Sequence, residues 1–145
     1  MKPSGLLFAS SIVFYVLYDI LSTVVAFNYL GTFQYEKSFL LKASFDAGGV
    51  LGFITMKMVF SLVALYLAYL LVERFQRFRG AGLGILVGAT AAGIFVGSSN
   101  FNIALNGNSF WLLGLDSGTV AMLIIIGCAA TGFLLTPSDR PMKTI

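Results

Sequence analysis

The chain of 145 residues is 58% hydrophobic and only 10% charged, with a net charge of +3 and a mean hydropathy of +0.92. Soluble domains carry about 25% charged residues, so this composition excludes a soluble domain and predicts an integral membrane protein in contact with the lipid bilayer. Histidine is absent and Cys128 is the only cysteine, which excludes an intrachain disulfide and the common histidine or cysteine metal sites. We expect no metal, no cofactor and no nucleic acid.

Four apolar runs are each long enough to cross a bilayer, which takes about 20 helical residues. They cover residues 5–30, 50–72, 81–105 and 112–135. The first run is too long for the apolar core of a secretory signal and lacks a convincing cleavage site, so we interpret it as a retained helix. The chain is therefore predicted to be all-α: one membrane domain over residues 1–145, with four transmembrane helices in one bundle.

The longest break between apolar runs mixes charged and aromatic residues. It contains Glu36, Lys37, Lys42 and Asp46 among several large apolar side chains. This mixture predicts an outer interfacial segment over residues 32–47, a short helix lying along the lipid headgroups; the alternative is a loop without regular structure. Aromatic residues of the two outer loops are expected to anchor the chain at the interface: Tyr35, Phe39, Phe110 and Trp111.

Lysine and arginine residues indicate the orientation in the membrane. They gather at the N-terminus, between the second and third helices, and at the C-terminus, as Lys2, Arg74, Arg77, Arg79, Arg140 and Lys143. These three regions lie on one side of a four-helix chain, whereas the opposite loops hold only Lys37 and Lys42. The positive-inside rule then predicts cytoplasmic N- and C-termini in a multi-pass protein of the cell membrane.

Two charged residues lie well inside apolar runs, Asp19 in the first and Lys57 in the second, and Asp116 lies in the first turns of the fourth. A charge at this depth costs roughly 2.5–3.5 kcal/mol on insertion scales, so it is expected to face protein or water and to have a partner. We predict that Asp19 and Lys57 pair with each other.

Other polar residues of the helices are predicted to join this ion pair in one pocket in the outer half of the bundle. The predicted pocket comprises Asp19, Ser22, Thr23, Lys57, Ser61, Asn100 and Asp116. A pocket of this kind binds a ligand, an ion or a polar group of a partner. The alternative is a purely structural ion pair, with Asp116 as a cap on the first turn of the last helix.

The third predicted helix is rich in small residues that recur every four positions. One series is Gly84, Gly88 and Ala92, and the other is Ala89, Gly93 and Gly97. Small residues let helix backbones approach closely in lipid, where packing replaces the hydrophobic effect between helices. The two series predict that this helix contacts neighbours on two sides.

The polar residues also carry a family resemblance. The pattern Asp19-x-x-Ser22-Thr23, then Gly31, Glu36, Lys57 and Asn100, resembles a group of small prokaryotic membrane proteins classed as a domain of unknown function. The similarity covers residues 15–105 and departs from the group where Lys37-Ser38 replaces the expected Asn-Pro. The resemblance implies that Asp19, Lys57 and Asn100 form a set, and it implies no activity.

Three functions are compatible with this sequence. The leading hypothesis is a non-catalytic subunit that packs against other membrane chains or against itself, since the third helix has two small faces and no reaction chemistry is recognised. The first alternative is a small ion- or solute-transporting bundle that uses the polar pocket. The second is a lipid-modifying enzyme in which Lys57 and Asp19 activate Ser22, Thr23 or Ser61, because without histidine the Ser-His and Cys-His arrangements are excluded.

Overall fold

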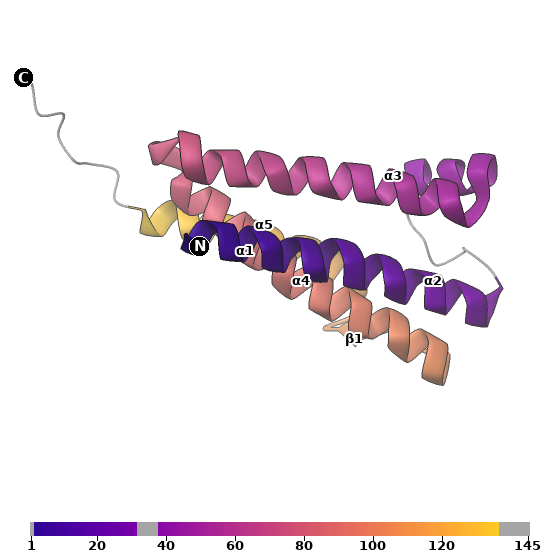
Figure 1. The fold of residues 1–145 in the computed structure, drawn as a ribbon. Coiled ribbons are helices and arrows are strands. Elements are labelled where there is room, and N and C mark those ends of the chain that lie inside the picture. The colour runs from indigo at the N-terminus through magenta and orange to yellow at the C-terminus, as the bar shows by residue number, and fades with distance from the viewer. Residues whose placement is uncertain (1, 32–37, 137–145) are drawn as a thin grey trace, which may run out of the picture.

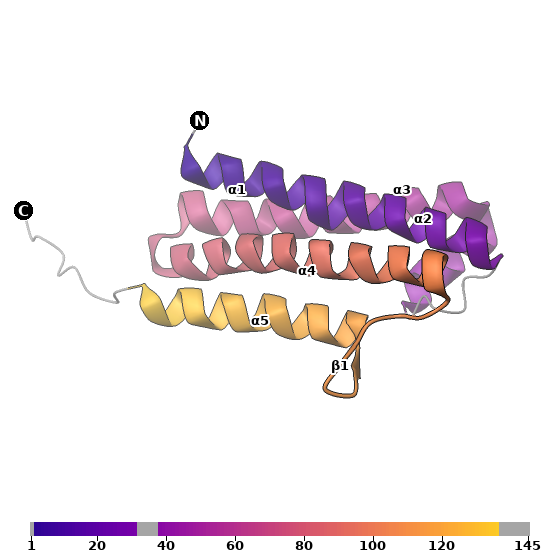
Figure 2. The same cartoon turned by 90° about the horizontal axis from the view of Figure 1, so that it is seen from below.

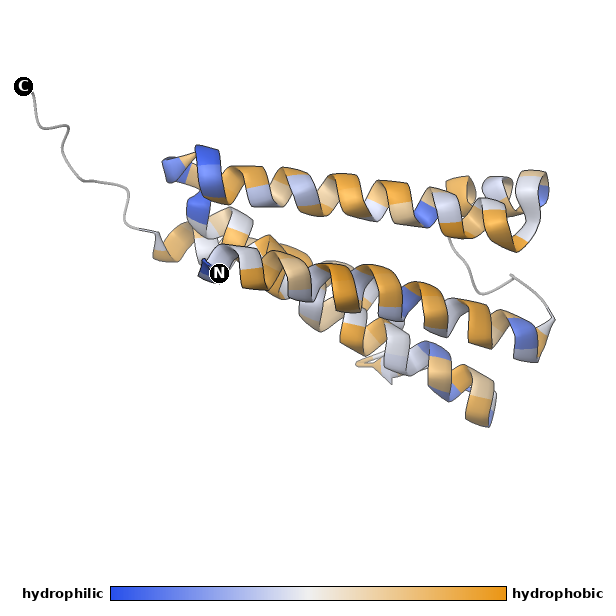
Figure 3. Cartoon of the chain, viewed as in Figure 1, coloured by the Kyte–Doolittle hydropathy of each residue, from blue (hydrophilic) through white to orange (hydrophobic). Residues whose placement is uncertain are grey.

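The computed structural model describes residues 2–31 and 38–136, and it is predominantly helical (Figure 1). Four helical stretches are long and apolar enough to cross a membrane: Pro3–Leu30, Phe39–Arg74, Gln76–Asn106 and Ser117–Leu135. The prediction of four long apolar helices is confirmed at this level. They lie side by side, and hydrophilic residues gather mostly towards their ends (Figure 3). We call the end that holds Lys2 and Arg74 the basic end, and the opposite end the far end.

The first stretch is built from three segments, α1 (Pro3–Ser11), η1 (Ile12–Tyr18) and α2 (Asp19–Leu30). Together they are called the first span. Proline is favoured in the first turn of a helix, where its missing N–H would be unpaired anyway, and Gly31 ends the span in the left-handed conformation (φ 66°). The middle segment η1 is a π-helix, which the apolar pattern did not predict. The π-helical turns end directly before Asp19.

The second stretch, α3 (Phe39–Arg74), begins earlier than residue 50 and is bent at Gly49. Gly49 has φ 61° and ψ −152°, a conformation open in practice only to glycine. We call residues 39–48 the short arm of α3 and residues 50–74 the long arm. The bend folds the short arm back beside the start of the long arm (Figure 1). The two arms approach so closely that a side chain at Gly52 would meet the Ser44 carbonyl.

Residues 39–47 of the predicted interfacial segment are helical, and residues 32–37 lie outside the described residues, so the placement of the segment along the headgroups stays a prediction. The short arm packs along the rest of α3, and Leu40 and Leu41 at its beginning line a cavity together with Lys57. Its start is therefore level with Lys57 and not at the end of the bundle. Phe39, one of the predicted anchors, is 80% exposed, whereas Tyr35 lies outside the described residues.

After the short helix η2 (Gln76–Phe78), α4 (Arg79–Asn106) runs through the middle of the molecule. It lies between the first span and α5 and also packs against α3 (Figure 2). A side chain added at Gly84 would meet the Cys128 carbonyl of α5, and one added at Gly93 would meet the Phe14 carbonyl of η1. In the same way Gly88 faces α5 and Gly97 faces the Tyr18 ring. The two small series thus face two neighbours, with Ala89 and Ala92 buried between helices.

The last part of the chain departs from the predicted helix at 112–135. Residues 111–116 form a hairpin of two short strands, β1 (Trp111–Leu112) and β2 (Leu115–Asp116), and α5 begins only at Ser117 and ends at Leu135. Leu113 and Gly114 both have positive φ, 53° and 78°, as a type I′ turn requires. The hairpin projects away from the helices beside the start of α5 (Figure 2). Trp111 is 66% exposed and Phe110 is 36% exposed.

Candidate functional site

The predicted ion pair between the first span and α3 is present. Lys57 Nζ lies 3.0 Å from Asp19 Oδ2, and only 13% and 10% of the two side chains are exposed. Lys57 Nζ also lies 5.3 Å from the centre of the Phe53 ring. A buried ion pair needs further hydrogen bonds to offset the cost of removing both charges from water. Those hydrogen bonds are supplied by the neighbouring side chains.

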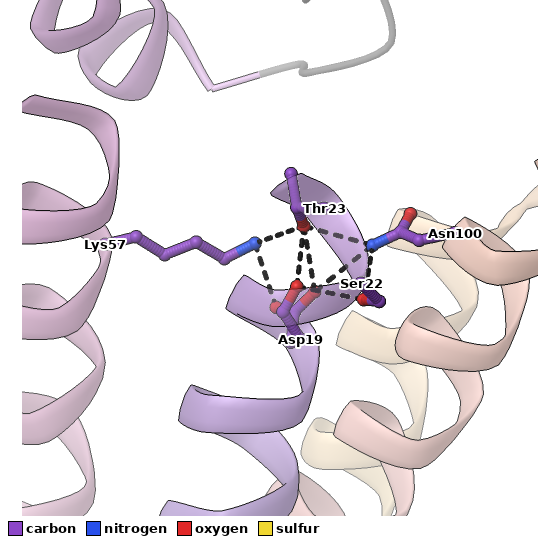
Figure 4. Close-up of polar contacts among 5 residues, drawn as sticks. All are labelled: Asp19, Ser22, Thr23, Lys57 and Asn100. Atoms are coloured by element: carbon purple, nitrogen blue, oxygen red, sulfur yellow. Dashed lines mark hydrogen bonds and ion pairs between the residues drawn. The ribbon is translucent and has the colours of Figure 1, made fainter. Parts of the chain in front are cut away.

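Five side chains form one hydrogen-bonded group, which we call the polar cluster: Asp19, Ser22, Thr23, Lys57 and Asn100 (Figure 4). Lys57 Nζ donates to Thr23 Oγ1 at 3.2 Å. Asn100 Nδ2 donates to Ser22 Oγ and Thr23 Oγ1, both at 3.1 Å. The cluster therefore connects the first span, α3 and α4 at one level of the bundle.

Helical spacing explains why the first span supplies three of these groups. Ser22 and Thr23 stand three and four residues after Asp19, and their hydroxyls donate to the Asp19 carbonyl at 2.9 and 2.7 Å. Each hydroxyl keeps its lone pairs free to accept from Asn100 or Lys57. Through these two hydroxyls the first span offers hydrogen-bond acceptors to the side chains of Lys57 on α3 and Asn100 on α4.

The numbers of hydrogen-bond donors and acceptors in the cluster show which N–H groups already have an acceptor. Asn100 has two N–H groups but three acceptors within reach, and its contact with Asp19 Oδ1 is the longest at 3.4 Å. The Thr23 hydroxyl reaches Asp19 Oδ1 only at 3.5 Å, since its proton is engaged by the carbonyl. Lys57 has three N–H groups and two acceptors among the described residues. The third N–H is available to another group.

Two cavities adjoin the polar cluster. The smaller, about 250 Å³, lies between the first span and both arms of α3. The larger, about 510 Å³, extends from the cluster towards the far end and is also lined by α4, the hairpin and α5. Asp19, Lys57 and Tyr15 line both cavities. The structure thus places the charged pair at the boundary of two open spaces.

Tyr15 is a member of the site that was not predicted. It shares the Asp19 face of the first span, but a half-buried tyrosine on a helix gives no signal in the sequence that separates a site residue from a packing residue. Its hydroxyl has no hydrogen-bond partner among the described residues, in which every fully buried side-chain oxygen or nitrogen has one. The hydroxyl is therefore accessible from the cavities.

Two predicted pocket residues are placed differently from the cluster. Ser61 lines the smaller cavity, but within the described ranges it makes no hydrogen bond to Lys57. Asp116 lines the larger cavity and caps α5, accepting from the N–H groups of Gly118 and Thr119 at 3.1 and 3.2 Å. The capping role considered for Asp116 is the one observed, and it leaves the carboxylate at the wall of the cavity.

The arrangement gives no support to a nucleophile in the cluster. The Ser22 and Thr23 hydroxyls donate to a carbonyl, so neither proton is directed at a base. In the described part of the chain no three His, Cys, Asp or Glu residues come together in a possible metal site. Cys128 is half-buried on α5, where its backbone packs against Gly84.

A second polar contact, at the basic end, was not predicted. Ser4 Oγ donates to Glu73 Oε1 at 2.8 Å, and Lys2 Nζ lies 3.4 Å from Glu73 Oε2. The contact joins the beginning of the first span to the end of α3. In the sequence Glu73 is followed by three arginines and two phenylalanines within residues 74–79, and its partners 69 and 71 residues away cannot be read from local spacing.

Comparison of the chain with models of known protein families, with curated proteins and with solved structures finds no match. The resemblance described from the sequence remains a prediction.

Proposed function

We propose that this protein is a multi-pass protein of the cell membrane that acts as a non-catalytic component of a membrane complex or of its own oligomer. In this proposal its termini are cytoplasmic, so that the basic end faces the cytoplasm and the far end faces outward. The polar cluster is a structural element that fixes how three of the helices pack.

The observation that carries the proposal is that both charges of the ion pair find their partners within this chain. Lys57 and Asp19 neutralise each other at 3.0 Å, and Asn100 and Thr23 add contacts from a third helix and from the first span. A transporter that uses one carboxylate to bind a cation would have to break this pair in every cycle. A fixed, neutral cluster is better suited to setting the register of helices.

The exposed apolar surface of the bundle favours a role in which another chain packs against it. Only 11% of the apolar window of α3 and of α5 is buried within the chain, against 44% for α4. Both helices therefore present long apolar faces, which lipid or helices of another chain cover. On α5 this face includes Gly127, where an added side chain meets nothing within 4 Å, so another helix could approach closely there.

Native mass spectrometry of the protein after gentle extraction from its own membrane tests the proposal. We expect a mass that contains this chain together with other polypeptides or further copies. Gly127→Leu should break that assembly while the monomer still folds, and the matched change Ile126→Leu on the same exposed face should leave it intact. A lone monomer for the parent chain would refute the proposal.

The cavities favour a second candidate, a binding pocket for a small molecule. The larger one lies within the range of about 300–1,000 Å³ typical of ligand pockets, and charged and polar side chains form one end of it. If the double variant Asp19→Leu/Lys57→Met folds and assembles but loses the activity of its complex, the purely structural role is wrong and the pocket is the functional part.

A further inference from the structure

We propose that the larger cavity binds a neutral, lipid-soluble carbonyl compound, whose carbonyl oxygen accepts hydrogen bonds from Lys57 and Tyr15. This inference deepens the second candidate function and rests on it. It does not depend on whether the chain is a subunit of a complex.

Two hydrogen-bond donors beside the larger cavity are not fully used. Lys57 Nζ donates to Asp19 Oδ2 and Thr23 Oγ1, lies 5.3 Å from the centre of the Phe53 ring, and keeps one N–H without a hydrogen-bond acceptor among the described residues. The Tyr15 hydroxyl likewise has no hydrogen-bond partner among the described residues. Both side chains line the larger cavity. A carbonyl oxygen has two lone pairs, so one such oxygen can accept from both donors.

The charged side chains beside the cavity favour a neutral ligand. Lys57 is already neutralised by Asp19, so an anionic ligand would compete with Asp19 for the same ammonium group and would also face Asp116 across the cavity. A cationic ligand would compete with Lys57 for the Asp19 carboxylate, and the Asp116 carboxylate already accepts hydrogen bonds from the N–H groups of Gly118 and Thr119 and from the Thr119 hydroxyl. Burying an uncompensated charge at this depth is costly, and the ligand that fits the existing charges is neutral.

The shape and composition of the cavity walls suit a lipid-soluble ligand. Between the polar cluster and the hairpin the cavity is lined by apolar side chains, among them Phe27, Leu30, Val96, Ile103, Met122 and Ile125. It is lined by both α3 and α5, two helices that do not pack extensively on each other in the described part of the chain. A lipid-soluble molecule can therefore enter from the hydrocarbon region without crossing water.

Trp111 makes the proposal directly measurable. It is the only tryptophan of the chain and lines the larger cavity, so its fluorescence reports on an occupant. The probe is decylubiquinone, a neutral quinone that quenches tryptophan, titrated into the protein in phosphatidylcholine nanodiscs. We expect saturable quenching that Tyr15→Phe weakens roughly 2- to 10-fold in Kd, the loss that corresponds to one hydrogen bond. Tyr66→Phe, on the exposed face of α3, is the matched control and should have no effect.

A second arm distinguishes a free quinone from the ester carbonyl of a bilayer lipid. Nanodiscs made with phosphatidylcholine brominated on its acyl chain should quench Trp111 in a manner sensitive to Tyr15→Phe if a lipid ester is the occupant. Ala121→Leu, which fills part of the cavity wall, should weaken quenching by whichever compound binds there. Quenching that neither Tyr15→Phe nor Ala121→Leu alters would show partition into lipid only and would overturn the proposal.

A cationic probe separates failure of this chemistry from failure of the pocket. A quaternary ammonium with a brominated alkyl chain should not bind if the proposal is correct. Saturable quenching by this cation that Ala121→Leu abolishes, without binding of the quinone or the lipid, would retain the pocket and refute the carbonyl. If no probe responds to Ala121→Leu, the pocket itself is wrong, and the structural role of the cluster is unaffected.

Discussion

Removal of the Lys57 charge should destabilise the bundle strongly, and joint removal of both charges should not. Lys57→Met keeps the length and apolar stem of the side chain but deletes the 3.0 Å contact with Asp19 Oδ2 and the 3.2 Å hydrogen bond to Thr23. Asp19 would then be left with Asn100 and Thr23 at 3.4 and 3.5 Å. An ionised carboxylate at the centre of the bundle would have only two long contacts.

The size of the effect follows from the cost of breaking a buried ion pair and from the cost of a lone charge inside a membrane helix. Breaking a buried pair by removal of one partner costs about 3–5 kcal/mol, and a lone aspartate in the centre of a membrane helix costs roughly 2.5–3.5 kcal/mol. The two ranges overlap near 3 kcal/mol. For Asp19→Leu/Lys57→Met we expect a free energy of unfolding within about 1 kcal/mol of the parent, because well-packed apolar residues replace a buried pair at little or no cost.

The measurement is reversible unfolding in mixed micelles, followed by far-ultraviolet circular dichroism and by the fluorescence of Trp111. Lys42→Met is the matched control. Lys42 makes no ion pair within the described residues, so its replacement should change the free energy of unfolding by about 0.5 kcal/mol or less. Agreement of the two probes would show that the transition is a single one.

Two results would refute the reasoning. A loss below about 1 kcal/mol for Lys57→Met would mean that the pair contributes little, as exposed ion pairs do. A double variant as unstable as Lys57→Met would mean that the cost does not come from an unpaired Asp19.

Three further outcomes are expected. Gly84→Ala should lower the melting temperature, because its methyl group would meet the Cys128 carbonyl, whereas Gly127→Ala, in open space, should leave it unchanged or raise it; equal melting of the two would refute close packing of α4 on α5. Glu73→Gln should cause a small loss of stability that disappears in about 1 M salt, where the screening length is about 3 Å, and a loss that persists in salt would assign it to the hydrogen bond from Ser4. Leu113→Asn should increase protection of the hairpin amides from hydrogen exchange, since asparagine adopts the positive φ of this turn more readily than leucine; decreased protection would show that the leucine side chain is itself held.

The sequence allowed the ion pair and the central helix to be predicted because both depend on helical periodicity. Asp19 and Lys57 lie well inside their apolar runs, whereas Asp116 lies in the first turns of the fourth run, so each was the best partner for the other. The small residues of α4 repeat every four positions and therefore share a face wherever the helix lies. In both cases a local rule determines a long-range contact.

The parts that were missed depend on backbone geometry at single residues. The adjacent pair Gly48-Gly49 stands directly before the apolar run that begins at residue 50, but the direction of the chain before it depends on the φ and ψ of Gly49 (61° and −152°), which the sequence does not specify. The hairpin at 111–116 lacks the Asn-Gly pair that usually signals a type I′ turn, with Leu113 at the first turn position. The π-helical segment η1 has the same apolar composition as an α-helix, so no residue pattern distinguishes it.

The distribution of glycine along α4 explains why the cavity lies at the far end. Gly80, Gly82, Gly84 and Gly88 let α4 pack closely on α3 and α5 near the basic end, and Gly93 and Gly97 receive the first span. Beyond Gly97 no glycine follows before Gly107, and α3 and α4 diverge towards the far end (Figure 1).

Helix length adds to this effect. With 19 residues α5 is about 28 Å long, whereas the 28 residues of α4 extend about 42 Å. On the side of α5, the far end of α4 is therefore accompanied by the hairpin and not by a helix, and the space that remains between the hairpin, α2 and α3 is the larger cavity. An ion pair in the tightly packed, glycine-rich part of the bundle would have no space beside it for a ligand. Here the diverging helices leave Lys57 and Tyr15 beside open space. A structural cluster can serve also as a binding site only where such space adjoins it.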